Sequence, residues 1–410
     1  MEYKELRKVY FQNDEEYNNE YAARYNSRNA FHLDFLIGNN PAFYEVNMEV
    51  QKLMLHILRT DKEVLKLEKV LPGAALDQYR KKCLIDEVLV TNGIEGVRST
   101  RKEINEAIEE VKNKSINKDK KKRFVGMVRR YLTLQEKDTI PLETCQDIRN
   151  LYDEVVLDEV IAENPKNAPD GAVFRKEQAT ITSSTDKELH RGFYPESKII
   201  IGIEKALQFL NNQSIESLYR ICLFHYLMEY VHPFYDGNGR LGRFIVSYML
   251  SKELEPLMAY RLSETIMENI KEYYDAFNTC NDFRSKGDIT PFLIMMLKMI
   301  DRAEVQLKET LQNKSISWKR YDGVIPMLPY ADEKRMSTVY SLFIQAALFS
   351  DEGISRQELC EIVRVSSPTI ARLVEKAKES GIVIEDRMGR SYFYKADLEG
   401  IEKILSEKKA

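Results

Sequence analysis

One segment in the middle of the chain constrains the fold more than any other. Residues 221–231 are apolar on almost every side and, with residues 217–220 before them, form a stretch too long for a buried strand. They therefore predict a buried helix. Pro233 ends this helix, and the residue types at 236–239 favour a tight turn with positive φ. A second helix is expected from about Arg240 to Leu250. Such a pair of helices must be buried by further helices.

The turn between these helices carries groups that suit phosphate binding. The backbone N–H groups of residues 237–239 and the positive end of the second helix would surround one small concavity. Arg240 and Arg243 are three residues apart, so both could grip phosphate oxygens from the same side. Asp236 offers a hard carboxylate oxygen to Mg²⁺. His232, at the end of the first helix, is a candidate general base for a hydroxyl nucleophile.

Two other readings of the same turn are weaker. Residues 237–242 formally match the G-x-G-x-x-G dinucleotide fingerprint, but that motif follows a strand, whereas here a helix precedes it. The second reading is purely structural, with Asn and Gly turning a corner and His232 as a packing residue. Nine specified residue types over twelve positions argue against that reading.

These nine residues resemble the signature of the Fic domain, H-P-F-x-[DE]-G-N-G-R-x-x-R, without a departure. They are His232, Pro233, Phe234, Asp236, Gly237, Asn238, Gly239, Arg240 and Arg243. The surroundings are also similar to the family, over about residues 70–300. The matching positions there are His225, Glu229, Leu262-Ser-Glu264, Tyr273-Tyr274, Gly287-Asp288 and Pro291-Phe292.

The resemblance implies a protein adenylyltransferase, which moves AMP from ATP onto a Ser, Thr or Tyr hydroxyl of a target protein. By resemblance, His232 would take the hydroxyl proton and Asp236 would hold Mg²⁺. The phosphates would be cradled by Gly237, Asn238 and Gly239, and Arg243 would bind the terminal phosphate. Arg240 would stabilise the phosphates or the loop. The donor base cannot be read from this loop, so a Fic transferase of UMP or phosphocholine stays open.

Residues 164–198 interrupt the helical pattern with several Pro and Gly residues, and the alternation at 178–182 suggests a short hairpin. By resemblance, residues 175–183 would be the flap that pairs with an extended segment of the target, with Thr180, Ile181 and Thr182 at its centre. The following residues 193–197 contain one proline, where many relatives have two or more.

Residues 91–96, Thr-Asn-Gly-Ile-Glu-Gly, match the loose pattern [ST]-x-x-x-E-[GN] that marks an inhibitory helix in Fic proteins, expected here at about 76–96. Thr91 and Glu95 would share one helical face ahead of Gly96. A carboxylate paired with Arg243 would occupy the guanidinium that the terminal phosphate needs. The alternative is a solvated carboxylate near a helix end. In some relatives the same Glu supports removal of AMP, and that also stays open.

The whole chain is expected to be mainly α, with a Fic helical bundle, a small β-hairpin flap and a C-terminal winged helix-turn-helix domain. Its 410 residues suggest two or three domains, and 43% hydrophobic with 31% charged residues is typical of globular proteins. We predict an N-terminal helical region at 1–69, the Fic domain at 70–310, a linker at 311–335 and the winged helix at 336–410.

The predicted C-terminal domain consists of helices at 338–349, 355–363 and 367–380, followed by strands at 382–386 and 391–394. Its recognition helix carries side chains that could reach DNA, but also two glutamates; they are Ser366, Ser367, Thr369, Arg372, Glu375 and Glu379. DNA binding and a protein-docking or homodimer role are both open. The alternative function is therefore a nucleotide-sensing transcriptional regulator.

Composition limits the other partners and the location. A formal charge of -4 predicts no general affinity for nucleic acid or membranes, and the basic run at 118–123 is interpreted as a solvated loop and helix face. Five cysteines far apart, with no C-x-x-C pair, suggest neither a zinc site nor a disulfide framework. Without a leader-like N-terminus or a long apolar run, a cytoplasmic location is expected.

Overall fold

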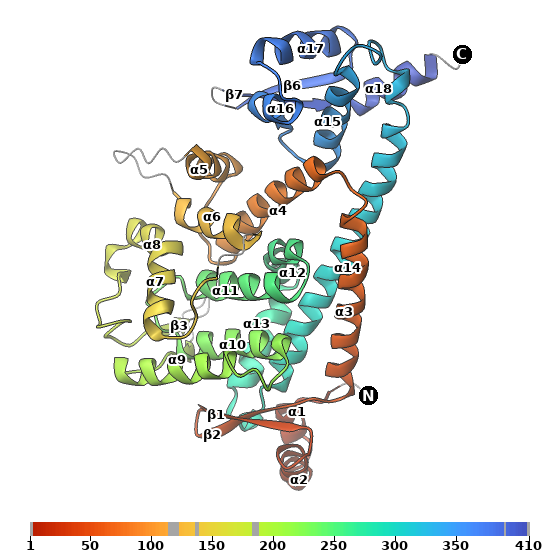
Figure 1. The fold of residues 1–410 in the computed structure, drawn as a ribbon. Coiled ribbons are helices and arrows are strands. Elements are labelled where there is room, and N and C mark those ends of the chain that lie inside the picture. The colour runs from red at the N-terminus through yellow and green to blue at the C-terminus, as the bar shows by residue number, and fades with distance from the viewer. Residues whose placement is uncertain (1–2, 114–122, 136–138, 183–187, 389–390, 408–410) are drawn as a thin grey trace. The chain divides into compact units, whose positions relative to one another are not determined.

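The computed structural model describes residues 3–113, 123–135, 139–182, 188–388 and 391–407, and they form a mainly helical fold (Figure 1). The chain divides into two compact units. One contains Met1–Asp61 and Leu84–Val305, and the other contains Lys62–Cys83 and Gln306–Ala410. The division falls inside three continuous helices rather than in loops. They are α3 (Met48–Glu68), α4 (Gly73–Ile94) and α14 (Thr290–Asp322).

The first unit begins with two helices and a β-hairpin. These elements are α1 (Leu6–Tyr10), α2 (Asp14–Tyr25), β1 (Ala30–Ile37) and β2 (Asn40–Glu45), the strands pairing antiparallel. The N-terminal helical region predicted at 1–69 thus includes a hairpin, and its long helix begins only at Met48. The alternating burial of Leu33, Phe35 and Ile37 shows why a strand forms here.

Helices make up most of the rest of the first unit. In chain order they are α5 (Arg101–Asn113), α6 (Val125–Leu132), α7 (Cys145–Val155), α8 (Leu157–Glu163), α9 (Glu196–Leu210), α10 (Ser217–Val231), α11 (Asn238–Glu253), α12 (Leu262–Glu268) and α13 (Ile270–Asn281). The hairpin of β3 (Thr180–Thr182) and β4 (Glu188–Arg191) lies between α8 and α9. α10 packs against both α9 and α11 (Figure 1). Nearly all of its side chains are buried.

The second unit has the order of elements that the sequence predicts at its C-terminal end. They are α15 (Met336–Phe349), β5 (Ile354–Ser355), α16 (Arg356–Val363), α17 (Ser367–Glu379), β6 (Val383–Met388), β7 (Ser391–Ala396) and α18 (Leu398–Glu407). The strands form one sheet in the order β5-β7-β6. Gly389 and Arg390, between β6 and β7 in the sequence, lie outside the described residues. The assignment as a winged helix stays a prediction.

The irregular linker predicted at 311–335 is helical in its first part, because α14 continues to Asp322. Leu307, Leu311, Ser315 and Trp318 are buried and recur every three or four residues, which places them on one face of that helix. This buried stripe outweighs the polar residues between them. No helix in the described part of the chain has both the length and the hydropathy to span a bilayer.

Candidate active site

The glycine-rich turn predicted between two buried helices is present, and its ends are defined by backbone conformation. His232 follows α10 in the left-handed region, with φ of 53°, and its N–H donates to the carbonyl of Met228 over 2.9 Å. Gly237 also has positive φ, 81°, directly before α11. The second helix thus begins at Asn238, two residues ahead of the predicted start at Arg240. Its first turn consequently faces the loop with free N–H groups.

Asn238 closes the turn onto itself. Its buried side chain accepts a hydrogen bond from the Phe234 N–H (3.0 Å) and donates one to the Phe234 carbonyl (2.9 Å). The Tyr152 ring stacks on the ring of Phe234 with 3.6 Å between centroids, and its hydroxyl donates to the Asp236 carbonyl over 3.1 Å. The loop is therefore a rigid support for the side chains that it carries.

The loop borders a cavity of about 310 Å³ that also takes residues from distant segments. Its lining includes predicted site residues from the loop (His232, Asp236, Gly237, Asn238, Gly239 and Arg243), Glu95 and Thr180. Helix α13 supplies a wall that the sequence analysis did not assign, formed by Tyr273, Tyr274, Phe277, Asn278 and Asn281. Positions 274, 277, 278 and 281 have helical i, i+3, i+4, i+7 spacing, so the periodicity after Tyr273-Tyr274 could have revealed this face.

His232 lies at the edge of this cavity with a largely buried ring. Burial, together with nearby His190 and Arg175, lowers the pKa of His232 to about 3. The imidazole is therefore neutral near pH 7 and able to accept a proton. The carboxyl of Glu229, one turn earlier on α10, places Oε2 3.8 Å from Nδ1 of His232. Burial, followed by the charge of Glu95, raises the pKa of Glu229 to about 8.

Arg243 is paired with the predicted inhibitory residues. Its Nη1 lies 2.8 Å from Glu95 Oε1, while Nε and Nη2 donate to the Thr91 hydroxyl (2.9 Å) and carbonyl (3.0 Å). The arginine is 1% exposed. Burial by itself would lower the pKa of Arg243, but Glu95, Tyr273 and Glu229 together outweigh it and the pKa is raised. A methyl group at Gly239 would overlap Glu95 Oε1, so the absence of a side chain there lets the carboxylate approach.

Comparison with known proteins agrees with this geometry. Residues 143–250 match the profile of the Fic/DOC family. The chain is 32% identical over 80 residues to the protein adenylyltransferase Fic of Nematostella vectensis, covering 20% of this chain and 17% of that protein. It is 24% identical over 229 residues to the protein adenylyltransferase Fic of Drosophila erecta, covering 54% of this chain and 41% of that protein.

A crystal structure of a Fic family protein from Desulfovibrio desulfuricans has the same fold, with a TM-score of 0.51 and 19% identity, over 87% of this chain and 98% of that chain. The chain contains a Fic domain. It spans less than half the length of the two curated relatives that it matches.

Thr91, Gly96 and Arg240 are predicted site residues of the Fic domain that do not line the cavity. Arg240 is fully buried and its Nη2 lies 3.7 Å from Asp236 Oδ1, a placement that suits loop stabilisation rather than nucleotide contact. Gly96 has φ of 73° and lies two residues after the end of α4, where a glycine commonly stops a helix. Because α4 ends at Ile94, Glu95 follows the helix rather than belonging to it.

The segment that carries Thr91 and Glu95 is anchored to the Fic core by Glu87, which sequence reasoning missed. Its buried carboxyl accepts hydrogen bonds from the Ser263 N–H (3.1 Å), the Ser263 hydroxyl (2.5 Å) and the Tyr131 hydroxyl (3.2 Å). Burial raises the pKa of Glu87 to about 7. The four-residue spacing of 87, 91 and 95 is that of one helical face, and this spacing could have revealed Glu87 from the sequence.

The predicted flap of the Fic domain is formed by β3 and β4. In the described part of that sheet, β3 pairs with β4 on one side, Thr180 facing Arg191 and Ile181 facing His190 in register. Ile181 and Thr182 are described only as strand residues, and Ser183 lies outside the described residues. Residues 118–122 of the basic run also lie outside them, while Arg123 pairs with Glu103 at 3.1 Å.

Asp236 could hold a metal ion beside this loop. Its carboxylate lines the cavity, and its side chain is 32% exposed. Among the described residues there is no cluster of three or more His, Cys, Asp or Glu side chains that could bind a metal. A single carboxylate next to a phosphate site fits Mg²⁺, which commonly completes its octahedral shell with phosphate oxygens and water.

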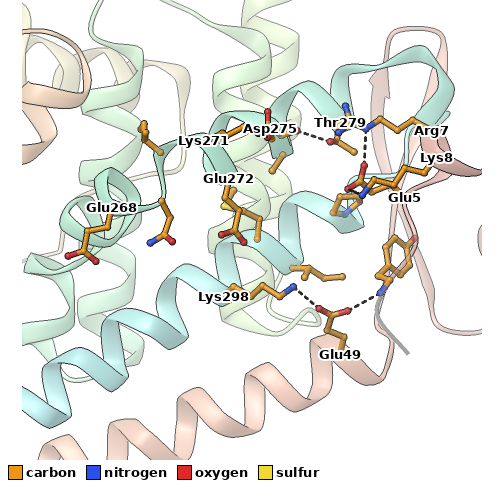
Figure 2. Close-up of a pocket in the computed structure, with 17 residues that line it drawn as sticks. Glu5, Arg7, Lys8, Glu49, Glu268, Lys271, Glu272, Asp275, Thr279 and Lys298 are labelled. Carbon is orange, nitrogen blue, oxygen red and sulfur yellow. Dashed lines mark hydrogen bonds and ion pairs between the residues drawn. The ribbon is translucent and has the colours of Figure 1, made fainter.

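A larger cavity of about 630 Å³ lies in the first unit, lined by residues of α1, α3, α13 and α14 (Figure 2). Its charged side chains pair with one another. Lys298 lies 2.8 Å from Glu49, which also accepts the Tyr3 N–H over 3.0 Å, and Lys8 lies 2.8 Å from Glu5 (Figure 2). Such mutual neutralisation is typical of a solvated groove.

Proposed function

We propose that this protein is a protein adenylyltransferase that moves AMP from ATP to a Ser, Thr or Tyr hydroxyl of a target protein. The observation that carries the proposal is the convergence on one cavity of a neutral His232, the Asp236 carboxylate, the glycine turn and Arg243. The curated relatives are named protein adenylyltransferases, which supports the same activity here.

The geometry supports a role for each group. The N–H groups of residues 237–239 and the Arg243 guanidinium would bind phosphate oxygens, and Asp236 would hold Mg²⁺, which neutralises phosphate charge when bound. His232 would take the proton of the target hydroxyl. The hydroxyl oxygen then bonds to the α-phosphorus, the bond between that phosphorus and the bridging oxygen breaks, and pyrophosphate leaves. Positioning and charge neutralisation supply most of the catalysis in such reactions.

The wall of α13 suits the base of the nucleotide. Tyr274 and Phe277 offer aromatic faces for stacking, and the amides of Asn278 and Asn281 offer both donors and acceptors for a heterocyclic edge. Competition of ATP, UTP and CDP-choline for the site would decide between AMP transfer and the transfer of UMP or phosphocholine.

We further propose that Glu95 inhibits the enzyme by occupying Arg243. An exposed ion pair stabilises a protein by only about 0–1 kcal/mol, which is too little for a firm brake. The arginine of this pair is shielded, because Arg243 is 1% exposed and also bonded to Thr91, while the Glu95 side chain is 25% exposed. Removing the carboxylate would free the guanidinium for the terminal phosphate. Whether Glu95 also supports removal of AMP would be tested by incubating AMP-modified target with the wild-type chain.

The test of the proposed function is labelling in a cell extract. The Glu95→Gly variant is incubated with labelled ATP and Mg²⁺, and labelled proteins are identified by mass spectrometry. We expect labelled target and self-modified enzyme, both absent when His232→Ala is added to the same chain. Bound ATP with no labelled protein in any variant would contradict the proposal.

The alternative, a nucleotide-sensing regulator that binds DNA through α17, has less support. Lys376 of that helix pairs with Glu333 and Lys378 pairs with Glu375 and Glu385, which weakens the positive potential that DNA binding requires. Salt-dependent, sequence-selective DNA binding without AMP transfer would favour this alternative.

A further inference from the structure

Arg175 joins the flap to the catalytic loop through one buried side chain. Its guanidinium is completely buried and donates to three backbone carbonyls: Nε to His232 (3.0 Å), Nη1 to Glu177 (2.6 Å) and Nη2 to Phe193 (2.9 Å). Glu177 leads into β3, and Phe193 follows β4. The Arg175 guanidinium therefore binds both ends of the flap and also His232, the proposed general base.

The backbone around Arg175 makes the same connection. The Arg175 N–H donates to the Pro233 carbonyl over 3.3 Å, and the Phe193 N–H donates to the Val231 carbonyl over 2.9 Å. A methyl group at Gly192 would overlap Arg175 Nη2 and lie 2.9 Å from Cβ of His232. The glycine leaves space for the guanidinium between the flap and the end of α10.

The hydrogen bond from Arg175 to the His232 carbonyl matters because His232 has a left-handed backbone conformation. A non-glycine residue in that region has a strained backbone, which persists only where its surroundings fix it. The carbonyl of His232 is fixed by Arg175, and its N–H by Met228. A charge-assisted hydrogen bond is roughly twice as strong as a neutral one, so the arginine is an effective restraint.

We propose that Arg175 is a positioning residue, which holds the flap and the imidazole of His232 in one fixed geometry so that a docked hydroxyl faces the base. This inference rests on the proposed AMP transfer for its functional meaning. Arg175 does not line the nucleotide cavity, so its effect on the reaction must pass through His232 and the flap.

The pKa of His232 depends on the charge of Arg175. Measuring this pKa therefore separates an effect of the charge from a purely structural role of Arg175. His190 on β4, Arg175 before β3 and Glu229 on α10 are the ionisable groups near the His232 ring. The guanidinium contributes to the lowered pKa of His232, after burial and His190. Replacing Arg175 with neutral glutamine should raise the pKa of His232, whereas lysine keeps the charge and should leave the pKa nearly unchanged.

The kinetic test compares Arg175→Gln and Arg175→Lys in the full chain carrying Glu95→Gly. Arg220→Gln is the matched control, because Arg220 is also buried and donates to the carbonyls of Ile215 (2.9 Å) and Leu210 (2.5 Å) near the start of α10. We expect Arg175→Gln to lose roughly 10²-fold in AMP transfer, the loss typical of a misplaced reacting group, with ATP affinity retained. Arg175→Lys should lose less, and Arg220→Gln should keep both transfer and ATP binding.

The second measurement follows the His232 imidazole by NMR titration, with His232→Asn identifying its signal among the five histidines. It needs no AMP transfer, so it separates a failure of this inference from a failure of the proposed function. Full transfer by Arg175→Gln, or loss of ATP binding together with transfer, would overturn the inference. So would an unchanged His232 titration in Arg175→Gln. Should that variant not fold, Arg175→Lys with undiminished transfer would overturn it instead.

Discussion

Around Arg243, one carboxylate pairs with the guanidinium and a second carboxyl group lies nearby. Glu95 makes the ion pair, while Glu229 lies close enough for the negative charge of Glu95 to help raise its pKa. The contact of Glu95 and Thr91 with Arg243 was predictable, since the spacing of Thr91 and Glu95 and the position of Arg243 are visible in the sequence. The altered acidity of Glu229 was not, because it depends on burial against residues distant in the chain.

The first prediction concerns the proposed inhibition by Glu95. Glu95→Gly should raise AMP transfer at least several-fold, visible as self-modification, because the guanidinium becomes available to phosphate. Arg243→Ala should be inactive with or without Glu95, since it removes the group for which carboxylate and phosphate compete. Transfer is measured with labelled ATP at saturating concentration. A wild-type rate equal to that of Glu95→Gly would show that Glu95 is not a brake.

A second prediction concerns pH. Folding raises the pKa of Glu229 from 4.5 to about 8, so between these values the folded chain holds a proton that the unfolded chain has lost. The free energy of unfolding should therefore fall as pH rises from about 4.5 to 8. Glu229→Gln cannot ionise and should show a shallower loss. Thermal unfolding of both chains at pH 5.5 and 8.5 checks this, and parallel losses would contradict it.

Among the elements, α4 illustrates which features of the fold a pattern predicts. Its limits and its stop at Gly96 agree closely with helical periodicity and the C-terminal glycine signal. The β1–β2 hairpin was missed because the exposed apolar residues Phe31 and Leu36 obscure the alternation of the buried Leu33, Phe35 and Ile37. The continuation of α14 was missed because its stripe of apolar residues is narrow and lies between many charged residues.

The third prediction tests the anchoring of α4. Glu87→Ala removes three hydrogen bonds to Ser263 and Tyr131 and leaves their donors buried, at a cost of about 1–3 kcal/mol for each unsatisfied group. The segment with Thr91 and Glu95 should loosen, and AMP transfer should rise although Glu95 is present. Glu87→Gln is the control, because its amide oxygen can still accept from Ser263. Equal transfer by wild type and Glu87→Ala would contradict the anchoring role.

The chain does not divide into consecutive domains in the way that its sequence suggests. A domain boundary near residue 311 follows from the polar composition there, but residues 62–83 belong to the same compact unit as residues 306–410. Tyr79 of this stretch is buried, with its ring 6.4 Å from that of Phe349 and the Lys314 amine 5.2 Å from the centroid of its ring. Contacts between segments so far apart in the chain leave no periodic signal.

The fourth prediction follows from this unit. A chain that ends at Asn313 should be less soluble and unfold at lower temperature than the full chain, because Tyr79 and its neighbours lose their partners. Phe349→Ala in the full chain is a milder test, with an expected loss of about 3–5 kcal/mol. Thermal unfolding and ATP binding of each are measured. A truncated chain with an unchanged unfolding temperature would contradict the prediction.

Gly239 also limits how this enzyme could change over generations. The same missing side chain opens the turn to phosphate and admits the Glu95 carboxylate. A larger residue at position 239 would thus displace the Glu95 carboxylate and narrow the proposed nucleotide site in one step. Single substitutions at Glu95 or Thr91 would release the proposed activity and leave the glycine-rich loop unchanged. Unregulated descendants of this chain should therefore arise from the segment after α4 or its last turns, and not from the loop.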